Sequence, residues 1–252
     1  MLQEFLTLNI FGFFLIFVRV GTAFMLMPGF ANGEIPPQVK LTVALAISFV
    51  LAPVLVGRLP ALPASPGALT LIVLAEAFIG GFFGSLTRLL ASALHVAGTI
   101  ISFVASLTNA FIHDPIADQQ SSTVSGFLGT VGMVLVFVTD MHHLMLRAVV
   151  DSYSLMPAGG ELVVGDFSEL MARHVADAFM LGVQLSAPFM VVGLAYYVGL
   201  GILSRLMPAL PVFFIGLPIQ IWIQLLVLML GLSAMMLVFV GRFEATLVPY
   251  LE

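Results

Sequence analysis

The sequence predicts an all-α integral membrane protein. Hydrophobic residues make up 61% of the 252 residues and charged residues only 8%, and the mean hydropathy is +1.17. Soluble domains carry roughly a quarter charged residues. The apolar stretches are continuous rather than alternating, which favours helices over a barrel, the other structure that satisfies its backbone in lipid.

Apolar segments separated by turns rich in proline and glycine account for most of the chain. Each crossing of a bilayer needs roughly 20 residues, so we expect one membrane domain of about six or seven spans. Glu4 stands where a signal peptide would be basic, so the first segment is predicted to be a retained span. The segments are Leu6–Met27, Leu41–Val56, Ala68–Leu86, Leu94–Ile112, Val124–Met141, Val175–Leu206 and Val212–Val240.

The last two segments are long and contain internal prolines. A helix over Val175–Leu206 would be about 48 Å long, against a hydrocarbon core of about 30 Å. Such helices favour tilted or kinked elements packed against other protein, with strongly tilted lipid-facing spans as the alternative. We expect a hairpin with Arg205 as a buried structural charge beside its turn. The predicted kink and turn residues are Pro188, Pro208, Pro211, Gly216 and Pro218.

Composition and motifs argue against several functional classes. The chain has no cysteine, and its net charge of −5 is scattered, so no nucleic-acid partner is indicated. Nucleotide-binding and serine-hydrolase motifs are missing, so we expect no enzyme activity and no cofactor. His142 and His143 are adjacent, and neighbours on a helix point about 100° apart, so no metal site is predicted.

Two charges lie deep inside apolar segments. Arg19 is in the first segment and Glu76 in the third. Burying a charge is expensive in a membrane, so each residue is a functional candidate, and together they are the natural buried pair. A structural salt bridge is favoured over a proton relay, because a relay needs several such groups along a path. Gly80 and Gly84 share the helix face of Glu76 and predict close packing against another helix.

A polar stripe runs along the fourth segment. His95, Thr99, Ser102 and Ser106 recur at spacings of four and three residues and continue into Asn109 and His113. A face of this kind predicts either a wet passage or hydrogen bonds to neighbouring helices. The stripe leads into a loop in which bulky apolar residues precede Pro115, and proline disfavours helix in the residue before it.

Motifs along the whole chain resemble the FliR/SctT family. They begin with Arg19, Pro28, Pro37 and Lys40, and continue with Glu76, Gly80, Gly84, Asp114-Pro115, His142-His143, Ser152 and Pro157. The most specific run is Gly201–Pro208 followed by Val212–Pro218. Ala209-Leu210-Pro211 stands where many members of the family carry Gln-Leu-Asn.

The resemblance implies a single-copy subunit of a type III protein export gate, built from long, kinked helical hairpins that assemble into a helical pore complex. Residues 1–174 would resemble the P-type subunit and residues 175–252 the Q-type subunit. A central loop, at about 106–122 here, would plug the closed pore. The plug residues would be Asn109, Ala110, Phe111, Ile112, His113, Asp114 and Pro115.

The predicted function is therefore passage of unfolded flagellar proteins through the inner membrane of a bacterium, at the flagellar basal body. The implied partners are P-type and Q-type subunits, a larger membrane protein of the export apparatus, the exported proteins and membrane lipid. An injectisome subunit of the same family is an alternative. A small-molecule secondary transporter is another, which would call for an internal repeat with paired broken helices.

Overall fold

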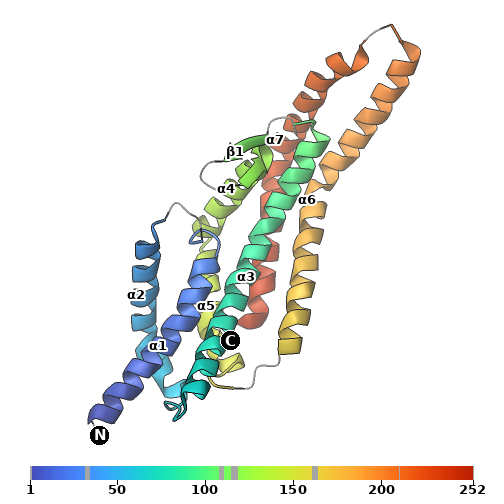
Figure 1. Ribbon diagram of the computed structural model, residues 1–252. Coiled ribbons are helices and arrows are strands. Elements are labelled where there is room, and N and C mark those ends of the chain that lie inside the picture. Colours follow the sequence, from blue (N-terminus) through green and yellow to red (C-terminus); the bar gives the residue numbers. More distant parts are fainter. Residues whose placement is uncertain are drawn as a thin grey trace. The chain divides into compact units, whose positions relative to one another are not determined.

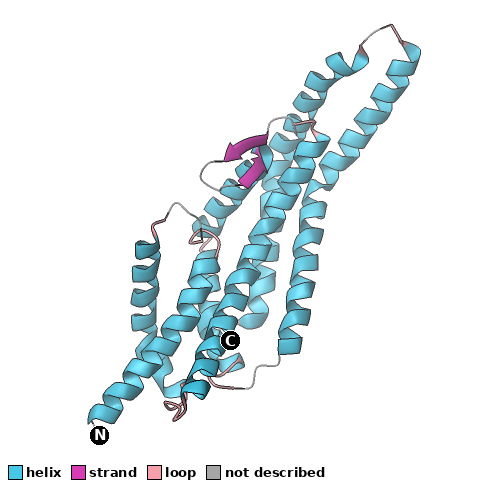
Figure 2. Ribbon diagram, in the orientation of Figure 1, coloured by secondary structure: helices cyan, strands magenta, loops and turns pink. Residues whose placement is uncertain are grey.

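The computed structural model describes residues 2–31, 35–107, 111–114, 119–160, 164–209 and 211–251. Its described residues form an all-α membrane protein with one short β-hairpin (Figures 1 and 2). The helices are α1 (Leu2–Leu26), α2 (Pro37–Leu55), α3 (Pro66–Val104), α4 (Thr123–Val138), α5 (Met141–Leu155), α6 (Val164–Leu206) and α7 (Val212–Leu247). Single 3₁₀ turns cover Val56–Arg58 and Val248–Tyr250, and the strands are β1 (Phe111–Asp114) and β2 (Gln119–Ser122).

Four helices are long and apolar enough to cross a membrane within the described part of the chain. They are α2, α3, α6 and α7, and the broken pair of α4 and α5 makes a fifth if it counts as one span. The sequence predicted six or seven spans. Two predicted segments, Ala68–Leu86 and most of Leu94–Ile112, fall within a single helix of 39 residues. In addition, α1 counts only as a shorter apolar helix, Ile10–Leu26.

Helix α3 continues through the predicted break because nothing there interrupts a helix. The stretch from Ser85 to Val96 contains neither proline nor glycine. Its one charge, Arg88, lies on an exposed face of the helix instead of in a connection. An arginine has a high helix propensity, so a lone charge inside an apolar run is a weak signal for a helix end.

The structure also extends helix into two polar stretches. Helix α5 follows a break at Asp140, whose φ of 58° is left-handed. Helix α6 begins at Val164 instead of Val175, and its early turns carry a salt bridge between Glu169 and Arg173. Pairs of this type at i and i+4 stabilise exposed helix. Hydropathy alone does not register such polar turns.

The chain divides into two compact units that alternate along the sequence. The first comprises residues 1–89, 137–174 and 243–252, and the second comprises residues 90–136 and 175–242. Helices α3, α6 and α7 contribute residues to both. The prediction that residues 1–174 resemble a P-type subunit and residues 175–252 a Q-type subunit is a comparison with other proteins. It stays a prediction.

Within the second unit, α6 and α7 form an antiparallel hairpin (Figure 1). The Tyr196 hydroxyl donates to the Gly216 carbonyl over 2.6 Å, and Gln224 Nε2 donates to the Phe189 carbonyl over 3.2 Å. Pro188 and Pro218 lie inside these helices, which continue past them. The turn between Leu206 and Val212 contains Pro208 and Pro211, where the sequence predicted it.

Candidate functional site

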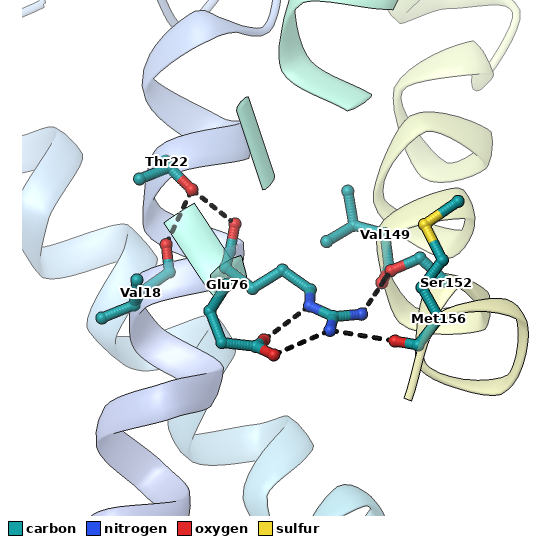
Figure 3. A network of polar contacts seen from close by, with 7 residues as sticks. Val18, Thr22, Glu76, Val149, Ser152 and Met156 are labelled. Carbon is teal, nitrogen blue, oxygen red and sulfur yellow. Dashed lines mark hydrogen bonds and ion pairs between the residues drawn. The ribbon is translucent and has the colours of Figure 1, made fainter. Parts of the chain in front are cut away.

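The first candidate site is a buried network centred on Arg19 in the first unit (Figure 3). Arg19 Nε donates to Glu76 Oε2 over 2.6 Å, and Nη2 donates to Glu76 Oε1 over 2.9 Å. Both side chains are fully buried. The sequence predicted these two residues as partners. The structure joins them in a bidentate pair, the geometry that matches a guanidinium to a carboxylate.

Helix α5 and the residue that directly follows it supply the remaining hydrogen-bond partners of the guanidinium. Nη1 donates to Ser152 Oγ over 3.0 Å, and Nη2 also donates to the Met156 carbonyl over 3.0 Å. Ser152 Oγ in turn donates to the Val149 carbonyl over 2.6 Å. Neither a serine hydroxyl nor a backbone carbonyl titrates near neutral pH. The network therefore favours a structural tie between α1, α3 and α5 over a proton relay.

Tyr153 completes the surroundings of Arg19. The centre of the guanidinium lies 3.8 Å from the centroid of the Tyr153 ring, a distance at which a cation is attracted to the ring face. The Tyr153 hydroxyl is buried and has no hydrogen-bond partner among the described residues. The ring therefore supplies the favourable contact, while the hydroxyl is an uncompensated polar group.

The residues of the polar stripe differ in their hydrogen-bond partners. In the second unit, His95 Nδ1 lies 3.0 Å from Ser125 Oγ on α4, and Thr99 Oγ1 donates to the His95 carbonyl of its own helix. Ser102 is buried, and its hydroxyl has no partner in the described part of the chain. The sequence left two interpretations of the stripe open, a wet passage or hydrogen bonds to neighbouring helices. The second applies to His95, which bonds to α4, and to Ser106, whose bonds to α6 and α7 are given below.

Ser106 lies where α3 ends, and its backbone is left-handed, with a φ of 58°. Its N–H donates to the Phe103 carbonyl over 3.2 Å, and the Leu107 N–H donates to the Ser102 carbonyl over 2.9 Å. These two bonds define a Schellman motif, which usually has glycine at the left-handed position. A side chain in this conformation costs about 1–2 kcal/mol, so surrounding contacts must hold it there.

The contacts that hold this end of α3 come from the α6–α7 hairpin. Ser106 Oγ lies 3.1 Å from the Tyr197 hydroxyl of α6 and 3.3 Å from Gln220 Oε1 of α7. Gln220 Nε2 donates to the Val104 carbonyl over 2.5 Å, and the Gln220 side chain is buried. Sequence reasoning missed Tyr197 and Gln220. A glutamine inside an apolar helix was the available signal, since a buried amide needs partners.

The predicted plug contains a β-hairpin, where the sequence suggested only a loop. Strands β1 and β2 pair antiparallel, with Phe111 opposite Ser122 and Asp114 opposite Gln119 (Figure 2). The plug residues Phe111, Ile112, His113 and Asp114 form β1, whereas Asn109, Ala110 and Pro115 lie outside the described residues. Pairing two short extended segments satisfies backbone groups that a simple loop would leave open.

The predicted burial of Arg205 is wrong for this chain, because its side chain is exposed. It lies in the last turn of α6, next to the hairpin turn, where no further helix of the described chain covers it. A basic residue there interacts favourably with the negative end of the helix dipole. Gly216, one of the predicted kink residues, accepts the hydrogen bond from Tyr196 described above.

The two adjacent histidines lie closer together than the helical angle suggested. The ring centroids of His142 and His143 are 4.0 Å apart, and ligand atoms of Asp140, His142 and His143 lie within 4.8 Å of one another. The rings are inclined by only 38°, and His142 also stacks on Phe137. Three potential ligand atoms thus lie near one another, and the expectation that no metal binds here stays a prediction.

Comparison with known proteins places the chain in a family. The sequence matches the family described as Bacterial export proteins, family 1, over residues 10–246. The flagellar biosynthetic protein FliR of Caulobacter vibrioides is 36% identical over 233 residues, which cover 92% of this chain and 93% of that protein. The FliR proteins of Bacillus subtilis and Escherichia coli are each 25% identical, over 94% and 81% of this chain and 92% and 77% of their own lengths. The sequence motifs and these matches agree, and the chain belongs to bacterial export proteins, family 1, the FliR/SctT family.

Proposed function

We propose that this chain is a subunit of the flagellar type III protein export gate, through which unfolded proteins cross the bacterial inner membrane at the flagellar basal body. The observation that carries the proposal is the similarity to a flagellar biosynthetic protein across nearly the whole chain, 36% over 92% of its length. The relatives named above are flagellar, which favours the flagellum over an injectisome. The long apolar helices suit a membrane-embedded role without chemistry of its own.

The chain is proposed to work as a single copy within a hetero-oligomer. P-type and Q-type subunits, together with a larger membrane protein of the export apparatus, are the expected partners. Much of the apolar surface of α6 and α7 is exposed on the isolated chain, including Phe214, Trp222 and Leu230. Large apolar patches of this kind suit contact with partner helices or lipid.

The segment from about 106 to 122 is proposed to close the pore before export. It follows the C-terminal end of α3, which carries the polar stripe, and contains the β1–β2 hairpin. A short hairpin is a compact obstruction that can move as a unit, because its strands are tied to each other by their own hydrogen bonds.

Deletion of residues 109–119 tests this function. The shortened chain should still assemble with tagged P-type and Q-type subunits, since the deletion lies outside the helices. Vesicles or cells that contain the assembled complex should then leak small ions. Assembly with a membrane as tight as that of the unaltered complex would show that this segment is not the barrier, and failure of the unaltered chain to recover the partners would contradict the gate itself.

A further inference from the structure

The C-terminal end of α3 is tied to the α6–α7 hairpin by side chains and not by backbone pairing. Three groups take part: Ser106 from the turn that directly follows α3, Tyr197 from α6 and Gln220 from α7. Gln220 is 1% exposed, so its amide has no access to water on this chain. A buried amide that lost these partners would remain unsatisfied, so the bonds are expected to persist in the folded state.

Gln220 satisfies a backbone group that the helix end leaves open. In the Schellman motif the carbonyls of Ser102 and Phe103 accept the two closing N–H groups. The next carbonyl, that of Val104, is among the last of the helix and has no place in the motif. Gln220 Nε2 donates to that carbonyl, while Gln220 Oε1 faces the Ser106 hydroxyl. One amide thus contacts both the last residue of α3 and the left-handed residue that turns the chain away.

Two neighbouring residues have the same chemistry but donate their hydrogen bonds within the hairpin instead of to this end of α3. Gln224 lies one turn after Gln220, is 2% exposed, and donates to the Phe189 carbonyl of α6. Tyr196 precedes Tyr197 and donates to the Gly216 carbonyl of α7. Both therefore link α6 to α7 within the hairpin. This difference provides matched controls for Gln220 and Tyr197.

We propose that Gln220 and Tyr197 are positioning residues for the closed gate. They hold Ser106 in its left-handed conformation and thereby set the direction in which the chain leaves α3 toward the β1–β2 hairpin. The inference rests on the proposed function of that segment as the plug, and it adds that closure depends on contacts from α6 and α7 outside the plug. A variant that loses these contacts keeps the plug sequence intact, but the base of the plug is no longer held in place.

The test compares Gln220→Met with Gln224→Met and Tyr197→Phe with Tyr196→Phe in the assembled complex. Each change removes hydrogen-bonding atoms and nearly preserves volume. Ion leak is measured for equal amounts of assembled complex, beside the unaltered complex and the 109–119 deletion. We expect Gln220→Met to leak at a level between those two references, Tyr197→Phe to leak less than Gln220→Met, and both control variants to remain tight.

The outcomes separate the inference from the function on which it rests. If the deletion leaks but Gln220→Met and Tyr197→Phe remain tight, the positioning role is wrong, whereas the proposed function of the segment as the plug is supported. Equal leak from Gln220→Met and Gln224→Met would also overturn the inference, because it would trace the defect to general weakening of the hairpin. If Gln220→Met does not assemble, Tyr197→Phe decides alone, since it removes a single oxygen. If the deletion itself remains tight, the proposed plug fails.

Discussion

Gly80 of α3 lies against the backbone of Arg19 in α1. A methyl group added at Gly80 would lie 2.1 Å from the Arg19 carbonyl oxygen and 2.2 Å from Thr22 Oγ1. One turn later, a methyl group at Gly84 would lie 2.6 Å from the Ala23 carbonyl oxygen. The two glycines therefore allow α1 and α3 to approach closely on the face that also carries Glu76. This close approach is what brings the Glu76 carboxylate within reach of the guanidinium.

Replacing Gly80 with alanine should destabilise the first unit. The new methyl group meets a backbone oxygen that can retreat only if α1 moves as a whole. Overpacking of this type typically costs about 1–3 kcal/mol, and separation of the helices would also strain the Arg19–Glu76 pair. Thermal unfolding in detergent should show a lower midpoint. Gly67→Ala is the control in the same helix, because nothing lies within 4 Å of its added methyl group; an equal loss there would contradict the packing argument.

Neutralising either member of the buried pair should reduce the amount of folded protein. Arg19→Gln leaves the Glu76 carboxylate buried without its cation, and Glu76→Gln leaves the guanidinium uncompensated, at a cost of roughly 3–5 kcal/mol. Yield of assembled complex and thermal midpoint are the measurements.

The double exchange Arg19→Glu with Glu76→Arg should restore only part of this stability. A carboxylate at position 19 would face the Met156 carbonyl, which now accepts a hydrogen bond from Arg19 Nη2. Full assembly of both single variants with loss of export would instead indicate a direct role in transport.

Tyr153→Phe should leave stability unchanged or raise it. The ring stays over the guanidinium, while a buried hydroxyl without a partner among the described residues is removed. An unsatisfied buried group costs about 1–3 kcal/mol, which sets the upper limit of the gain. Tyr153→Leu is the comparison, because it removes the ring as well and should destabilise. A large loss of stability from the phenylalanine variant would mean that the hydroxyl has a partner in the assembled gate.

The sequence by itself determined the class of the protein and several of its most constrained residues. Continuous apolar runs with few charges indicate helices in lipid, because the backbone must satisfy itself there and the strands of a barrel would alternate instead. Arg19 and Glu76 could be paired from sequence because a charge deep in an apolar segment needs an opposite charge, and few were available. Gly80 and Gly84 predicted a close helix contact because glycine at this spacing lets two helix backbones approach closely.

Only the tertiary structure decided where helices end and which polar groups meet. The predicted segments left Arg88 in a gap between two helices, yet α3 continues through it, because one exposed arginine does not interrupt a helix. Ser106 belonged to a visible stripe, but its partners Tyr197 and Gln220 come from segments far along the chain. A hydrogen bond depends on atoms brought within about 3 Å, and local sequence patterns do not specify which distant turns of two helices are placed that close together.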